Sequence, residues 1–252
     1  MKINWDSEVL SSVSKVVDQL EHLSINKDSI ESVADWLAYE EFPIPNSAAV
    51  RDDADDFIRA TMFMNTLNFA FTDFDKSIKY EINKDGKILS DSEAMYFQVN
   101  NAISSGIKLT DGNEMASISL HQLKNIFVGN IEMPMLKERV EILNEVGQKL
   151  VDSYEGDWIN FINNGPKKLY SDGGGLIERL IEEFPRFDDS SQFKESNVKF
   201  YKLAQLAFWV IHAELSGSNY FKIEDMNSMT AFADYIIPVS YTHLRAHETT
   251  EH

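Results

Sequence analysis

The stretch PMLKERVEILNEVGQKLVDS, from Pro134 to Ser153, decides the fold class. Its apolar or small residues recur with a period near 3.6 and form one stripe: Leu136, Val140, Leu143, Gly147 and Leu150. A proline is tolerated in the first turn of a helix, and the glycine at position 156 marks the end of this one. The spacing therefore predicts an amphipathic helix with one face against a core.

The same helical spacing continues on both sides of this segment. It predicts helices over residues 9–20, 29–39, 57–71, 92–105, 115–127, 157–163, 176–184 and 197–215, and a last one from Asn227 or Ser228. From Leu203 onward the 197–215 segment is apolar nearly all round, which is typical of a buried central helix. Ile78 to Leu89 alternates around a turn at Asn83–Gly86 and predicts a β-hairpin. We expect a mainly α fold, a single helical domain with one small β-hairpin.

The last fourteen residues, 239–252, do not continue this pattern. They are polar, hold three of the six histidines, and resemble the in-frame translation of a sequencing adapter. We therefore expect the helical domain to occupy residues 1–238 and the tail to be non-native. A natural polar tail is the alternative.

Composition and charge exclude several function classes. With 43% hydrophobic and 25% charged residues in 252, the chain is typical of a globular protein. It has no cysteine, which excludes disulfides, iron–sulfur clusters and thiolate zinc sites. A net charge of −18 disfavours nucleic acid and anionic membranes. Neither a signal peptide nor a run of roughly 18 apolar residues is found, so a cytoplasmic location is expected.

Common catalytic motifs are absent. The histidines outside the tail, His22, His121 and His212, lack the spacing of a metal site, and no G-x-S-x-G elbow supports a serine triad. The loop from Asp172 to Leu176 could direct amide groups at an anion, but a flexible turn is favoured because the phosphate-loop ending GK[ST] is missing.

Two charged residues are more informative. Lys202 stands at the entrance of a nearly all-apolar helix, so its ammonium must reach solvent, pair with a carboxylate or bind a ligand anion. Asp234 lies among aromatic and apolar residues, where desolvation would raise its pKa unless it faces solvent. The pattern alone leaves these alternatives open.

Five segments, in order, resemble the queuosine salvage proteins, which are queuosine 5′-phosphate N-glycosidases. The likeness runs from about Asp53 to Pro238. Its anchors are LNFAF at 67–71, IF at 126–127 with MLKER at 135–139 and LNEVG at 143–147, FPRFD at 184–188, VKFYKLAQ at 198–205, and MTAFADY at 229–235.

This resemblance implies a fold similar to the helical DNA glycosylases. The implied reaction is hydrolysis of the N-glycosidic bond of queuosine 5′-monophosphate, which releases queuine for reuse in tRNA modification. The implied partner is this small nucleotide, without nucleic acid or membrane. No metal or organic cofactor is expected, and a monomer is expected.

The resemblance also implies roles for individual residues. Asp234, in the F-A-D-Y motif, is the catalytic carboxylate, and Lys202 pairs with it or with the 5′-phosphate. The implied substrate-binding residues are Asn68, Phe69, Phe71, Arg139, Asp225, Phe232 and Tyr235. The aromatic rings would stack on the base, Asn68 would bind a base edge or a hydroxyl, Arg139 an anion, and Asp225 the diol or its amine.

The sequence departs from the family pattern in three places. Thr72 stands where many relatives have tryptophan. The segment Phe208–His212 differs from eukaryotic relatives and indicates a bacterial-type member. The family continues past Pro238, so a C-terminal truncation is expected. Two alternative functions remain: a glycosylase acting on a nucleic-acid polymer, and a non-catalytic helical binding module.

Overall fold

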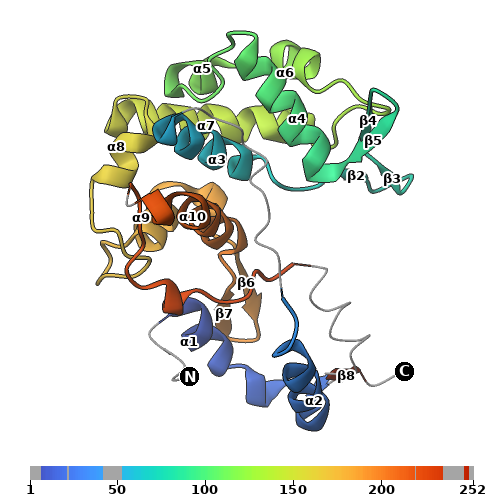
Figure 1. Cartoon of the computed structure of the whole chain (residues 1–252), viewed down its shortest axis with the longest axis vertical. Helices are drawn as coiled ribbons and strands as arrows, with labels where there is room; N and C mark the ends of the chain where they lie inside the picture. Colours follow the sequence, from blue (N-terminus) through green and yellow to red (C-terminus); the bar gives the residue numbers. More distant parts are fainter. Residues whose placement is uncertain (1–6, 22, 42–52, 219, 235–246, 250–252) are drawn as a thin grey trace. The chain divides into compact units, whose positions relative to one another are not determined.

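The computed structural model describes residues 7–21, 23–41, 53–218, 220–234 and 247–249. The chain divides into two compact units (Figure 1). Unit 1 comprises Met1–Pro45, Asp189–Lys202 and Asn227–His252, and unit 2 comprises Asn46–Asp188 and Leu203–Met226. A compact unit need not be a domain that folds alone, so a single domain over residues 1–238 stays a prediction.

Unit 2 is built mainly from helices that follow the predicted segments. They are α3 (Ala54–Thr66), α4 (Asp91–Ser104), α5 (Gly112–Ser117), α6 (Leu120–Ile126), α7 (Leu136–Tyr154), α8 (Trp158–Asn163), α9 (Leu176–Glu183) and α10 (Lys202–Leu215), the last without its first residue. The longest, α7, buries Leu136, Leu143, Gly147 and Leu150 of its predicted stripe. The segment that decides the fold class is thus a core helix.

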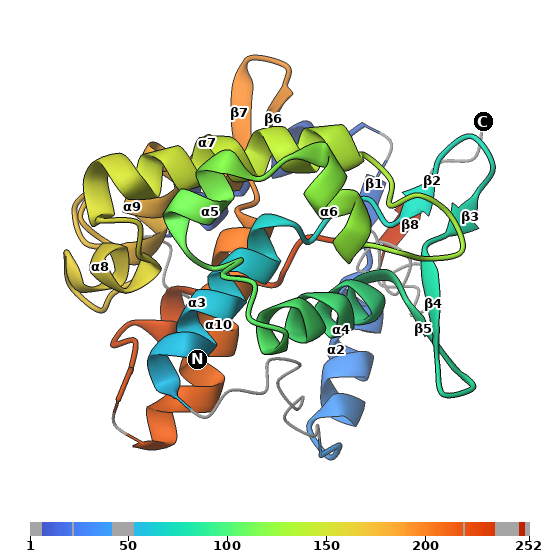
Figure 2. The same ribbon diagram turned by 90° about the horizontal axis from the view of Figure 1, so that it is seen from above.

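Gly147 allows α5 to lie directly against α7, as both views of the chain show (Figures 1 and 2). A Cβ atom at Gly147 would lie 2.3 Å from the backbone nitrogen of Ala116 and 2.7 Å from the carbonyl oxygen of Gly112. Asn144, one turn away, donates to the carbonyl oxygens of Met115 and Ile118. The two helices therefore approach at backbone distance.

An aromatic cluster fills the core between α7, α8 and α9. The Trp158 ring lies 4.9 Å from Phe184 and 5.7 Å from Phe161, centre to centre, and meets Phe161 edge to face. Tyr154 packs edge-on against Phe161 at 5.3 Å. These contacts fix the ends of three helices, because large rings in such geometries contribute packing energy beyond their buried area.

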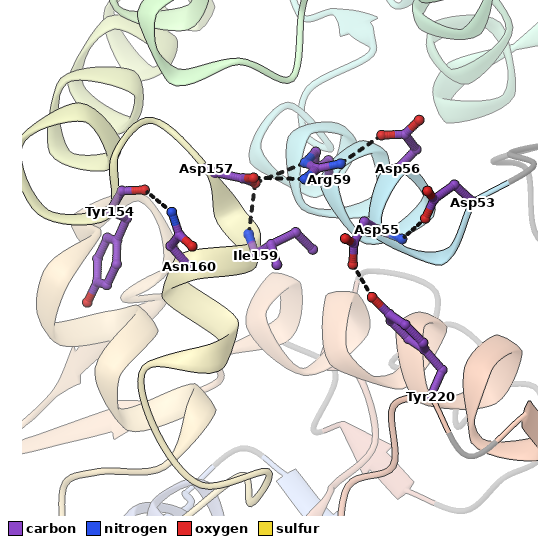
Figure 3. A network of polar contacts seen from close by, with 9 residues as sticks. All are labelled: Asp53, Asp55, Asp56, Arg59, Tyr154, Asp157, Ile159, Asn160 and Tyr220. Carbon is purple, nitrogen blue, oxygen red and sulfur yellow. Dashed lines mark hydrogen bonds and ion pairs between the residues drawn. The ribbon is translucent and has the colours of Figure 1, made fainter.

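A polar network joins the start of α3 to the start of α8 (Figure 3). The Arg59 guanidinium donates to both carboxylate oxygens of Asp157, at 2.9 and 2.8 Å, and to Asp56 at 2.8 Å. Asp157 also caps α8 by accepting the backbone N–H of Ile159. One carboxylate therefore caps one helix and anchors another, in the bidentate geometry that arginine favours.

The predicted fold class is wrong in its strand content. The described residues contain three antiparallel hairpins: β2 (Thr72–Asp73) with β3 (Ile78–Lys79), β4 (Glu81–Lys84) with β5 (Lys87–Ser90), and β6 (Ser190–Phe193) with β7 (Ser196–Lys199). A further pair joins β1 (Leu23–Ile25) to β8 (His247–Thr249). The fold is therefore mixed, although helices dominate, and not a helical domain with one small β-hairpin.

The hairpin predicted over Ile78–Leu89 is present at β4–β5. Its turn is Asp85–Gly86, where both residues have positive φ, 51° and 88°, as a tight two-residue hairpin turn requires. Ile78 belongs to a different strand, which pairs with β2 instead.

Unit 1 contains α1 (Glu8–Ser14), α2 (Lys27–Leu37) and the β6–β7 hairpin. The hairpin packs on α1: the Lys199 amide donates to the buried Ser12 hydroxyl at 3.0 Å, and the Lys199 ammonium pairs with Glu8 at 2.8 Å. Tyr201 donates a second hydrogen bond to Glu8. Tertiary contacts with α1 therefore hold strands whose own sequence is mostly polar.

Five predicted helices are corrected. The 57–71 helix ends at Thr66, and the 9–20 helix is α1 followed by a separate 3₁₀ turn at Val17–Gln19. The 115–127 helix is two helices, because Ser119 and Gln122 form a capping box that starts α6. The 197–215 helix begins only at Lys202, since residues 196–199 form β7. The last helix is a single 3₁₀ turn, Met226–Ser228, followed by irregular chain to Asp234.

Within the described part of the chain, no helix has the length and apolar character needed to span a bilayer.

Candidate functional site

Lys202 and Asp234 form an ion pair in unit 1. The Lys202 Nζ lies 2.8 Å from a carboxylate oxygen of Asp234, and about a quarter or less of either side chain is exposed, 21% and 26%. Lys202 is the first residue of α10, whereas Asp234 lies in irregular chain. The sequence left three alternatives open for the Lys202 ammonium: solvent, a carboxylate or a ligand anion. In the structure it pairs with a carboxylate. Partial burial strengthens such a pair, because less water screens it.

Two aromatic residues flank Asp234 in the sequence. Phe232 is half-buried in the same irregular segment. Tyr235, expected to stack on the base, lies outside the described residues, as does Pro238 of the same motif.

Three predicted substrate-binding residues share one turn of unit 2. Asn68, Phe69 and Phe71 follow the end of α3 and are all half-buried. The Asn68 side-chain amide donates to the hydroxyl of Tyr96 at 3.2 Å. Burial raises the pKa of Tyr96 to about 12, so its hydroxyl stays protonated at neutral pH. The Asn68 side chain is therefore held by a neutral partner.

Arg139, expected to bind an anion, is directed at this turn. Its side chain is completely buried and donates to backbone carbonyl oxygens: Leu67 at 2.5 Å, Ala70 at 2.9 Å, Pro134 at 3.0 Å, and Phe69. Burial, and to a lesser extent the charge of Arg186, lowers the pKa of Arg139 to about 10, which leaves it charged at neutral pH. Its hydrogen bonds in the structure thus belong to the main chain.

Asp225, expected to contact the diol or amine, also binds main chain. Its two oxygens accept the backbone N–H groups of Leu169 and Tyr170, at 2.7 and 3.1 Å. Asp225 and its two partners belong to unit 2, and they lie far from residues 67–71 in the sequence.

The loop from Asp172 to Leu176, before α9, is held by a carboxylate of the protein itself. Glu178 accepts the backbone N–H groups of Ser171 at 2.6 Å and Gly175 at 2.8 Å. These two amide groups donate to Glu178 in the structure and not to a ligand anion. This agrees with the prediction that the loop is a turn.

An open groove of about 490 Å³ lies elsewhere in unit 2. It is lined by Arg59, Ile103, Gly106, Ile107, Lys108, Thr110, Asp111, Glu155, Gly156 and Asp157. None of the predicted site residues within the described ranges lines it. Its charges are mixed, and Arg59 and Asp157 in it already satisfy each other, so we place no site there. The described residues also hold no cluster of three or more histidine, aspartate or glutamate side chains suited to a metal ion.

Two residues at the turn had no role predicted from the sequence. Arg186, inside the FPRFD anchor, donates to the carbonyl oxygen of Thr66 at 2.9 Å and lies over the Phe69 ring. Tyr96 lies in α4 without any local motif. The anchor was a signal for Arg186, whereas nothing in the sequence pointed to Tyr96.

Comparisons with known proteins point to one family. The family model described as Queuosine salvage protein matches residues 48–251. A relative from Sphaerobacter thermophilus, named Queuosine 5′-phosphate N-glycosylase/hydrolase, is 26% identical over 239 residues, covering 94% of this chain and 72% of the relative. Relatives of the same name from Bos taurus and Mus musculus are each 30% identical, covering 72% and 77% of this chain. The chain spans only 53% and 57% of the length of those two.

Proposed function

Because the chain belongs to the queuosine salvage protein family, we propose that it hydrolyses the N-glycosidic bond of queuosine 5′-monophosphate and releases queuine. The predicted family is confirmed, and the hydrolase class agrees with the names of the relatives. The observation that carries the proposal for this chain is the ion pair between Lys202 and Asp234, which joins two family motifs at 2.8 Å.

The chemistry of the reaction suits a carboxylate at this place. Breaking the bond between the base and the ribose builds positive charge on the anomeric carbon. The Asp234 carboxylate would stabilise this charge, activate water or attack the carbon directly. Lys202 would orient the carboxylate through the ion pair, and it carries a charge that suits the 5′-phosphate.

The substrate contacts belong to the same proposal. Asn68 would bind a hydroxyl or a base edge, while Phe69, Phe71, Phe232 and Tyr235 would offer rings for stacking. Contacts from Arg139 and Asp225 to the nucleotide stay predictions, and both side chains have main-chain partners in the structure.

Several broader features stay proposals as well. They are a single free nucleotide as partner rather than a nucleic-acid polymer, a monomer, a cytoplasmic location, a bacterial-type member, a non-native tail and a likeness to the helical DNA glycosylases. The composition supports two of them. A net charge of −18 is unsuited to a polyanion, and a chain without cysteine suits a reducing compartment.

The test is release of free queuine from queuosine 5′-monophosphate by the purified protein. Asp234→Asn keeps the shape of the side chain and removes its charge, so we expect kcat to fall by about 100-fold or more. Glu8→Gln is a matched control, since Glu8 forms an ion pair of the same length with Lys199 in the same unit. We expect its activity within about twofold of wild type.

The outcomes separate the parts of the proposal. No queuine from the wild type would overturn the activity, and normal release by Asp234→Asn would remove Asp234 from the mechanism. The unphosphorylated nucleoside, compared with the nucleotide, tests whether any cation of the site binds the 5′-phosphate.

A further inference from the structure

The turn at residues 67–71 has an unusual backbone that needs outside support. α3 ends at Thr66, and Ala70 has a φ of 47°, in the left-handed region that residues other than glycine rarely occupy. The last carbonyl groups of the helix have no following turn whose N–H groups could donate to them. A conformation of this kind persists only where surrounding groups fix it.

Arg139 supplies that support from α7. Four of its hydrogen bonds go to carbonyl oxygens, three of them in the turn: Leu67, Phe69 and Ala70. The fourth, to Pro134, ties the same guanidinium to the start of its own helix. A planar guanidinium has five N–H donors spread over three nitrogens, whereas a lysine has three N–H donors on one nitrogen and cannot span these four acceptors in the same way.

A second arginine acts on the same turn. Arg186 donates to the Thr66 carbonyl oxygen at 2.9 Å. Both guanidinium carbons lie over the Phe69 ring, 4.3 Å from its centre for Arg139 and 4.4 Å for Arg186. Two cations so close together repel each other, and the ring face and the carbonyl dipoles offset this repulsion. The pair therefore fixes both the backbone and the aromatic side chain beside Asn68.

We infer that Arg139 and Arg186 are positioning residues, which hold the 67–71 turn so that Asn68 and Phe69 meet the substrate in a fixed geometry. The inference rests on the proposed function for the identity of the substrate. Arg139 has no exposed surface and donates to main-chain carbonyl oxygens, so we assign it a role through the turn in place of the predicted contact with the nucleotide.

The conservative variants Arg139→Lys and Arg186→Lys keep the charge and lose the fork. We expect each to lower kcat/KM for queuosine 5′-monophosphate about tenfold or more under conditions where the protein is fully folded. Arg179→Lys is the matched control. Arg179 is also buried, donates to the carbonyl oxygens of Phe161 and Gly174, and lies 4.6 Å from the Phe161 ring centre, away from the turn. Its loss of kcat/KM should stay within about twofold, and equal losses in all three variants would overturn the inference.

A double-mutant cycle with Asn68→Ala distinguishes positioning from general stability. If Arg139 acts through Asn68, then Arg139→Lys should cost less than about threefold once Asn68 is removed. Effects that multiply independently would contradict a role through Asn68.

Hydrogen exchange of the amides at residues 66–72 tests the same claim without activity. We expect faster exchange there in Arg139→Lys and Arg186→Lys, but not in Arg179→Lys. Unchanged exchange would overturn the positioning role even in an active enzyme. If the arginine variants exchange faster but the wild type releases no queuine, the two arginines still stabilise the turn, and the proposed function is wrong.

Discussion

At the residue scale, Gly147 shows how one missing side chain sets the distance between two helices. Alanine normally favours a helix over glycine by about 1 kcal/mol. Here the added Cβ would meet backbone atoms of Gly112, Met115 and Ala116, none of which can rotate away. We therefore expect Gly147→Ala to lower the free energy of unfolding by about 1–3 kcal/mol, measured by denaturant titration.

The control for this change is on the same helix. Glu145 is exposed on α7, so Glu145→Ala should leave the free energy of unfolding within about 0.5 kcal/mol of wild type. A Gly147→Ala protein as stable as wild type would mean that α5 and α7 are not in backbone contact.

The sequence predicted part of this residue-level picture. The stripe on α7 marked Gly147 as facing the core, because burial repeats with the helix period. The pattern could not identify the partner of Arg139, since its acceptors are carbonyl oxygens about 70 positions away in the chain. A charged residue in a motif suggests ligand binding, whereas main-chain acceptors leave no trace in side-chain identity.

At the scale of elements, we expect the contact between α3 and α8 to depend on pH. Burial of the Asp157 carboxylate favours its neutral form, but the hydrogen bonds and charge of Arg59 and the Ile159 amide outweigh burial and hold the pKa of Asp157 below its usual value. The unfolded chain then binds the proton more readily, so this contribution to stability is present above the unfolded pKa of about 4 and is lost as pH falls through the folded pKa.

Asp157→Asn should remove this dependence. We expect the variant to be less stable than wild type at pH 7, with a smaller further loss of unfolding free energy between about pH 4 and pH 2, measured by chemical denaturation at each pH. Asp56→Asn is the control, because Asp56 pairs with the same arginine but is 58% exposed, where ion pairs contribute little. An acid profile of Asp157→Asn parallel to that of wild type would contradict the assignment.

Two elements show which features of secondary structure the sequence pattern does not predict. The residues of the capping box, Ser119 and Gln122, are present in the sequence, but the apolar spacing continues across them and therefore predicted one helix. The β6–β7 hairpin could not be predicted, because Ser190–Phe193 and Ser196–Lys199 hold few strand-forming residues and depend on contacts with α1. Local preference is weak where tertiary contacts decide the structure.

At the scale of the whole molecule, the sequence identified the family but not the arrangement of the chain. The five anchors agree with the family match over residues 48–251. The division into units joins segments far apart in sequence, such as α1 with β7, and no pattern along one segment contains that information. The ion pair between Lys202 and Asp234 is likewise a long-range contact within unit 1. The family resemblance implied it as one of two partners for Lys202, and the spacing along the chain alone could not decide between them.

The net charge of the chain favours a free nucleotide over a nucleic-acid polymer as the proposed substrate. Proteins that bind nucleic acid without sequence preference neutralise several phosphates, and their affinity falls steeply with salt. With 41 acidic against 23 basic residues, this chain repels a polyanion at long range, while one or two cations can still bind a single phosphate. We therefore expect a labelled tRNA, titrated with the protein and followed by fluorescence anisotropy, to bind more weakly than about 100 μM, the weak end of non-specific binding, at both 50 and 200 mM salt. Queuosine 5′-monophosphate is the positive control for a working site. Tight tRNA binding that weakens with salt would show that the basic residues gather on one face, and it would favour a polymer glycosylase.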